Sequence, residues 1–116
     1  PMSVLTRDVI FDEIAAGRLK ITPLEQDQVG AASIDLTLGD EIRQIIPAAG
    51  AIDIVDDTDY REHTQVVSLA SPYTLHPGET IHGITRELVE LPPNLCGFLE
   101  GRSRYARLGL DRKSVV

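Results

Sequence analysis

The sequence predicts a mainly β fold, an all-β sandwich or barrel preceded by one short helix. Short strand-like runs recur through the chain, separated by glycine, proline, asparagine and aspartate, and in residues 34–38 apolar and polar residues alternate. Alternation with a period of two is typical of strands that bury one face. Several short strands separated by turn residues are typical of antiparallel sandwiches and barrels.

The predicted helix runs from Leu5 to Gly17. Thr6 is placed to cap its first turn, and Gly17 is placed to end it. Several apolar side chains recur at the spacing of one helix face, and several acidic residues lie early in the segment. The apolar set is Leu5, Val9, Ile10 and Ile14, and the acidic set is Asp8, Asp12 and Glu13.

Strands are predicted for most of the remaining chain. Ile34 to Leu38 alternates apolar and polar residues, Gly39-Asp40 is interpreted as a turn, and Glu41 to Ile46 as the second strand of a hairpin. Turns are also predicted at Pro77-Gly78 and Pro92-Pro93-Asn94. The other predicted strands are residues 52–55, 66–69, 80–85, 87–91 and 95–100.

The composition is typical of a soluble globular chain, with 42% hydrophobic and 25% charged residues. Its 116 residues predict a single domain, residues 1–116, in which Pro1 is interpreted as a cloning remnant. The single cysteine, Cys96, lies in an apolar run, which predicts a buried, inert thiol in a reducing cytoplasm. No apolar run reaches membrane-spanning length, and the net charge of −7 disfavours a general nucleic-acid binder. We therefore expect neither a membrane nor a nucleic acid as a partner.

Positive charge gathers near the C-terminus. Residues 102–113 hold five of the eleven Lys and Arg residues but one of the eighteen Asp and Glu residues. Guanidinium groups suit phosphate, the Ser103 hydroxyl adds a donor, and nearby glycines let the backbone approach an anion. The segment therefore predicts an anion-binding loop, and the alternative is that it neutralises neighbouring carboxylates. The five cations are Arg102, Arg104, Arg107, Arg112 and Lys113.

Other polar groups give weaker indications of a site. Residues 56–59 form a charged loop whose spacing does not fit an EF-hand, so a solvated loop is expected. The three histidines lack metal-ligand spacing, which favours surface or packing roles. Glu100 is expected to be a strand-end carboxylate near Arg102 or Arg104, and Tyr105 either packs within the loop or stacks on a base. The histidines are His63, His76 and His82.

Four blocks of the sequence, in order, resemble the dCTP deaminases, which share a fold with the trimeric dUTPases. The resemblance extends from the N-terminal helix to Leu110. It implies a dUTPase-like β-barrel or jelly-roll-like sandwich, incomplete in this chain, and a cytoplasmic homo-oligomer, a trimer in the family. The blocks are Ser33-Ile34-Asp35-Leu36-x-Leu38-Gly39, Leu75-x-Pro77-Gly78-Glu79, Leu91-Pro92-x-Asn94-Leu95-x-Gly97, and Glu100-Gly101-Arg102-Ser103 followed by Ala106-Arg107-Leu108-Gly109-Leu110.

The resemblance also implies a reaction, the hydrolytic deamination of dCTP to dUTP and ammonia, with dCTP or dUTP as the nucleotide partner. It gives Arg102 and Ser103 phosphate contacts, Ser103 and Arg107 catalytic roles, and Asp35 a place near the sugar and the metal-bound phosphates. Mg²⁺ would be held through the nucleotide phosphates, with few protein ligands. No zinc is implied, because one cysteine does not supply the ligand set of the zinc deaminases.

Two departures from the family pattern qualify these expectations. Arg104 stands where many members carry a second serine, and it either adds a phosphate contact or alters the triphosphate pose. Family members also continue into a segment with the glutamate that activates water, so this sequence is interpreted as truncated at its C-terminus. A positioned base contributes roughly 10²–10⁴-fold to rate, which predicts binding without efficient turnover. The alternatives are a catalytically silent nucleotide-binding homologue and a dUTPase-type pyrophosphatase.

Overall fold

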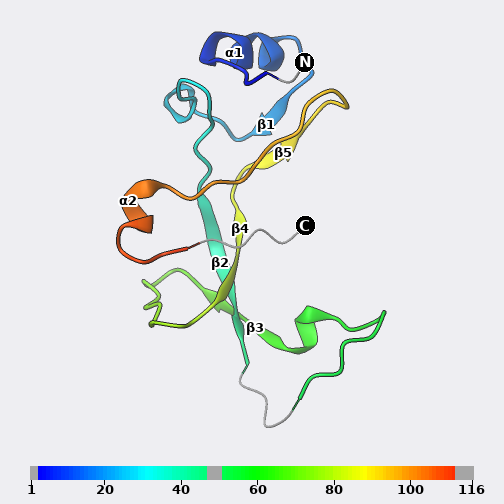
Figure 1. The fold of residues 1–116 in the computed structure, drawn as a ribbon, viewed down its shortest axis with the longest axis vertical. Helices are drawn as coiled ribbons and strands as arrows, with labels where there is room; N and C mark the ends of the chain where they lie inside the picture. The colour runs from blue at the N-terminus through cyan, green and yellow to red at the C-terminus, as the bar shows by residue number, and fades with distance from the viewer. Residues whose placement is uncertain (1–2, 47–50, 112–116) are drawn as a thin grey trace.

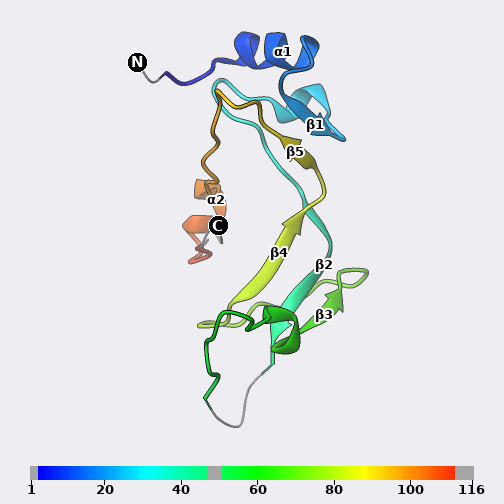
Figure 2. The same ribbon diagram turned by 90° about the vertical axis from the view of Figure 1, so that its right-hand side faces the viewer.

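The computed structural model of the chain describes residues 3–46 and 51–111. Two small antiparallel sheets follow one another along an elongated molecule, with a helix at one end (Figure 1). The view turned by 90° shows the same arrangement and places the second helix to one side of the sheets (Figure 2). The prediction of a mainly β fold with a short leading helix is confirmed. Pro1, Arg112 and Lys113 lie outside the described residues.

Helix α1 spans Arg7–Ala15, close to the predicted helix. Thr6 occupies the N-cap position, although its side chain makes no capping hydrogen bond. Gly17 has a φ of 74°, the left-handed conformation that commonly ends a helix. The buried face contains Ile10, which is 4% exposed, whereas Val9 is 40% exposed. The predicted apolar stripe is therefore wrong at Val9, because the face that packs on the core contains Ile10, Phe11 and Ile14 instead.

The main core lies between α1 and the loop that follows β1 (Lys20–Thr22). Strand β1 pairs antiparallel with β5 (Leu88–Glu90). The 3₁₀ helix η1 (Gln26–Gln28) follows β1 in the chain. An antiparallel bridge between Val29 and Ile34 then closes a short loop. The buried cluster is Ile10, Leu19, Ile21 and Val29, with Leu5, Phe11, Ile14, Leu24 and Ile34 packed against it. The core therefore anchors the chain directly before residue 35.

The second sheet has β2 (Leu38–Ile45) between β3 (Thr64–Ser68) and β4 (Ile81–Thr85). Residues 39 and 40 lie inside β2 rather than in a turn, and residues 35–37 lie in no strand, so both the first strand and the hairpin predicted here are wrong. A Cβ on Gly39 would lie 3.1 Å from the carbonyl oxygen of Ile84. The glycine therefore allows β4 to approach closely, a use that the sequence pattern does not distinguish from a turn.

Most of the other predicted elements are confirmed. Strands β3, β4 and β5 match the runs at 66–69, 80–85 and 87–91, and a turn at Pro77-Gly78 closes with a 3.0 Å hydrogen bond from the Glu79 N–H to the His76 carbonyl. The predicted strands at 52–55 and 95–100 do not form. Neither run has a partner strand in the described part of the chain, and Cys96 is therefore exposed rather than buried. Within residues 3–46 and 51–111, no helix has both the length and the apolar character needed to span a membrane.

Candidate functional site

A large groove brings the predicted site segments together. Its volume is about 1440 Å³, and its lining comes from residues 3–5, α1, residues 32–38, both sheets and residues 94–102. Most of the lining is apolar. The charged side chains in its described lining are Asp35, Glu100 and Arg102. Charge is therefore concentrated where the 32–38 and 94–102 segments meet the groove.

Arg102 and Asp35 form an ion pair at this groove. The Arg102 Nη1 lies 3.7 Å from the Asp35 Oδ2, and the two side chains are 66% and 52% exposed. Two residues that the family resemblance assigns to one site, and that lie far apart in the sequence, are thus close together in the structure. Exposed ion pairs at this separation are weakly held. The exposed Arg102 guanidinium is therefore accessible to an anion at the groove.

The segment after Arg102 is a short helix rather than the predicted loop. Helix α2 spans Ser103–Ala106, and the Tyr105 and Ala106 N–H groups each donate to the Arg102 carbonyl at 3.0 Å. The Arg107 N–H donates to the Ser103 carbonyl at 3.0 Å. Side chains four residues apart on a helix share a face, so Ser103 and Arg107 lie on the same side of this turn. Both residues are exposed, and neither lines the groove.

Arg104 lies apart from the Arg102–Asp35 pair in its contacts. Its guanidinium carbon is 5.9 Å from the centre of the Tyr105 ring, a cation–π geometry. Tyr105 is 45% exposed, and neither residue lines the groove. Of the predicted phosphate contacts, the structure therefore places Arg102 at the groove and Ser103 and Arg104 on the adjoining helical turn.

Glu87 is a residue of this region that the sequence analysis missed. It is 4% exposed, and its two carboxylate oxygens accept the Thr37 N–H at 2.5 and 3.1 Å. The Thr37 N–H lowers the pKa of the Glu87 carboxyl below its ordinary value, while burial acts in the opposite direction. The only hint in the sequence is that Arg86-Glu87 joins two strands without glycine, proline or asparagine.

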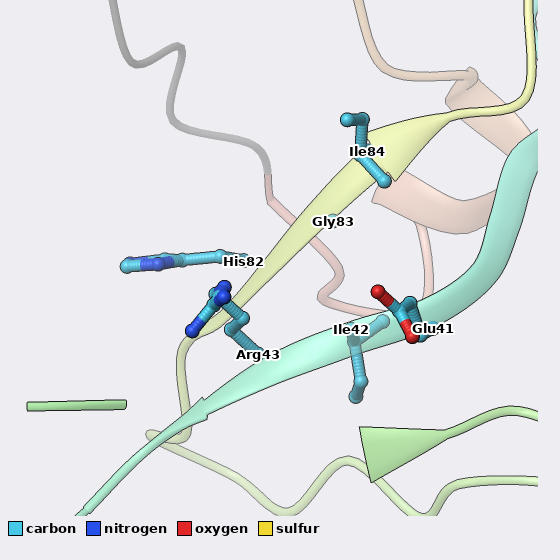
Figure 3. Close-up of a pocket in the computed structure, with 6 residues that line it drawn as sticks. All are labelled: Glu41, Ile42, Arg43, His82, Gly83 and Ile84. Carbon is cyan, nitrogen blue, oxygen red and sulfur yellow. The ribbon is translucent and has the colours of Figure 1, made fainter. Parts of the chain in front are cut away.

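A second, smaller hollow of about 250 Å³ lies on the sheet formed by β2 and β4 (Figure 3). Arg43 and His82 are cross-strand partners there, and their side chains lie next to each other. The Tyr60 ring meets the His82 ring edge to face at 6.0 Å, which agrees with a packing role for this histidine. None of the predicted site residues lines this hollow, so the candidate site is the larger groove.

The described residues offer few ligands for a metal ion. No group of three or more His, Cys, Asp or Glu side chains within residues 3–46 and 51–111 is placed to hold one. The Asp35 carboxylate provides an oxygen donor beside Arg102. Carboxylate oxygen is a ligand type that Mg²⁺ prefers.

Comparison with known proteins agrees with the motifs. The family model described as dCTP deaminase-like matches residues 4–116. A dCTP deaminase of Rhodospirillum rubrum is 40% identical over 107 residues, which cover 84% of this chain and 54% of the relative. A dUMP-forming dCTP deaminase of Rhodococcus jostii is 39% identical over 106 residues, which cover 90% of this chain and 56% of the relative. One of Methanosphaerula palustris is 31% identical over 102 residues, which cover 88% of this chain and 54% of the relative. The chain spans about half the length of these curated relatives, and it belongs to the dCTP deaminase-like family.

Proposed function

We propose that this chain binds dCTP as the nucleotide-binding part of a cytoplasmic dCTP deaminase, which converts dCTP to dUTP and ammonia. The observation that carries the proposal is the 3.7 Å approach of Arg102 to Asp35 at the groove. An exposed guanidinium is suited to bidentate contact with phosphate oxygens. The names of the relatives support dCTP as the nucleotide.

In this proposal the residues of α2 and its flanks divide the work. Arg102 and Ser103 hold the phosphates, and Arg104 adds a further phosphate contact. Ser103 and Arg107 act at the base, where the fixed charge of Arg107 stabilises the negative charge that develops as water adds to the pyrimidine ring. The common face of Ser103 and Arg107 on the helical turn supports this pairing.

Mg²⁺ enters the proposal with the substrate. A triphosphate carries several negative charges, and a bound Mg²⁺ neutralises part of them. In this proposal Asp35 faces the sugar and the metal-bound phosphates, while Arg102 contacts the phosphate oxygens. The Asp35 carboxylate beside Arg102 supports this role, since a metal carried by phosphates needs few ligands from the protein.

Incubation of the purified chain with dCTP and Mg²⁺ is expected to raise its melting temperature without efficient release of ammonia. Ligand binding stabilises the folded state by mass action. Turnover needs a positioned base, which contributes roughly 10²–10⁴-fold and which the resemblance assigns to a part of the relatives that this chain does not span. Thermal unfolding with dCTP, dUTP or ATP and an ammonia assay on the same samples measure both properties.

The outcomes of this experiment separate the alternatives. Protection by dCTP with no ammonia supports a nucleotide-binding chain, and protection that is stronger with dUTP supports the dUTPase-type alternative. Release of ammonia and dUMP would match the reaction in the names of the dUMP-forming relatives. Equal stability with and without each pyrimidine nucleotide would contradict the proposal.

We also propose that copies of the chain associate, as a homotrimer. The apolar groove supports association, because Phe98 is 86% exposed in its lining and soluble monomers rarely expose large apolar patches. The sedimentation coefficient is expected to rise with protein concentration, and Phe98→Ser is expected to weaken this rise. Ile54→Ser is the control, since Ile54 is 89% exposed outside the groove lining. A coefficient that stays at the monomer value at all concentrations would contradict association.

A further inference from the structure

Residues 35–37, the segment that carries Asp35, belong to neither sheet of the described chain. Residues 35–37 lie between the Val29–Ile34 bridge and the start of β2, and their backbone groups need other partners. Gln28 supplies two of them. Its carbonyl accepts the Asp35 N–H at 2.7 Å, and its side-chain Nε2 donates to the Asp35 carbonyl at 2.9 Å. Both backbone polar groups of Asp35 are therefore held by one residue.

The turn between β4 and β5 holds Thr37 in a similar way. Both oxygens of the Glu87 carboxylate accept the Thr37 N–H, and the Arg86 N–H donates to the Thr37 carbonyl at 2.8 Å. The turn itself is tied by the Thr85 hydroxyl, which donates to the Glu87 carbonyl at 2.8 Å. The segment is thus fixed on both sides of Leu36.

Glu87 is the buried, charged member of this arrangement. Burying a carboxylate is costly unless hydrogen bonds replace its water, and here the Thr37 N–H provides that replacement. A charged acceptor also makes a stronger hydrogen bond than a neutral one. Glu87 does not line the groove, so it acts on the site through the backbone of Thr37.

We propose that Glu87, together with Gln28, is a positioning residue for the nucleotide site. By fixing residues 35–37, these two side chains set the Asp35 carboxylate opposite Arg102, while the Asp35 side chain itself stays exposed. The effect on nucleotide binding rests on the proposed function. The effect on the Asp35–Arg102 geometry does not, and it is measured separately.

The first test compares Glu87→Gln with Glu90→Gln, which makes the same charge change at an exposed position of β5. In the wild-type chain, the NMR signal of the Thr37 amide is expected to move as Glu87 is protonated at low pH. The signal should move in the same way in Glu90→Gln and should lose this movement in Glu87→Gln. A Thr37 signal that behaves alike in both variants would overturn the proposal.

The pH dependence of stability gives the same variant a second readout. Because the Thr37 N–H lowers the pKa of Glu87 in the folded chain, the charged Glu87 carboxylate stabilises the fold at pH values above the pKa that Glu87 has in the unfolded chain. That contribution is lost as the pH falls through the folded pKa. Glu87→Gln is therefore expected to lower the melting temperature at neutral pH and to differ little from wild type at low pH. A difference in melting temperature between Glu87→Gln and wild type that is the same at neutral and at low pH would contradict a stabilising role for the charged Glu87 carboxylate.

Nucleotide affinity then tests positioning against a merely structural role. Glu87→Gln is expected to weaken dCTP·Mg²⁺ binding roughly two- to fivefold, the range that follows from loosening an exposed ion pair. Asp35→Asn should also weaken binding, and the double variant should bind no more weakly than Asp35→Asn alone, because residues that act through one another are not additive. Additive losses, or unchanged affinity in Glu87→Gln, would overturn the proposal.

If the wild-type chain does not bind dCTP, the proposed function fails and the positioning is decided without nucleotide. The carbon signal of the Asp35 carboxylate is then compared with and without Arg102→Ala, at neutral pH. Removal of Arg102 is expected to shift this signal in the wild-type chain and to shift it less in Glu87→Gln. An equal shift in both backgrounds would show that Glu87 does not set the pair.

Discussion

Arg102→Ala is expected to remove most of the thermal protection that dCTP and Mg²⁺ give to the chain. Hydrogen bonds to charged groups contribute about 1.5–3 kcal/mol each. Loss of one such contact weakens binding roughly ten- to a hundredfold, because each 1.4 kcal/mol is tenfold in affinity. Thermal unfolding across a dCTP titration, with calorimetric binding as a second method, measures the loss. Arg102→Lys should be intermediate, since lysine keeps the charge but not the planar fork.

Arg61→Ala is the matched control for this variant. Arg61 is 64% exposed, close to the 66% of Arg102, and it also pairs with an aspartate, Asp59, at 2.9 Å. Its hydrogen bonds lower the pKa of Asp59, so it is the more firmly held of the two arginines. Exposed ion pairs contribute little to stability, and both variants are expected to fold. Equal dCTP protection in the two variants would remove the cationic segment from the site.

The residues of the candidate site could be predicted in part. Local chemistry pointed to residues 101–110, where arginine, serine and glycine gather, and the resemblance added Asp35. The 3.7 Å contact between the two is tertiary, and no periodicity of the sequence contains it. Glu87 was missed for the same reason, because its partner Thr37 is far away in the chain. An acid in a strand connection is ordinarily solvated.

The fold was predictable where local signals and tertiary packing agree. A helical apolar face together with Gly17 correctly predicted α1, and Pro77-Gly78 correctly predicted a turn. The failures occur where a residue pattern serves two purposes. Gly39 fits a turn or a close strand contact, and the apolar run at 95–100 needs a strand partner that the described chain does not provide. Strand formation depends on such partners more than on intrinsic preference.

Ile10→Ala is expected to cause the largest loss of stability among single substitutions in α1. Ile10 is 4% exposed in the cluster that joins α1 to β1 and to the Val29–Ile34 bridge. Replacing a buried isoleucine by alanine costs about 2–5 kcal/mol, through lost burial and the cavity left behind. A chain of this size should then melt roughly 10 °C lower. If Ile10→Ala does not fold, Ile10→Val gives a smaller loss of about 0.5–1.5 kcal/mol.

Val9→Ala separates burial from helix preference at the neighbouring position. Val9 is 40% exposed, and alanine favours the helix more than valine does, so its stability should stay within about 0.5 kcal/mol of wild type. Equal losses in the two variants would mean that α1 packs through a broader face than the structure shows. Loss of packing at Ile10 is also expected to affect the site, because Ile34 packs against the core that contains Ile10 and directly precedes Asp35. At temperatures where both variants are folded, we therefore expect Ile10→Ala, and not Val9→Ala, to weaken dCTP binding as well.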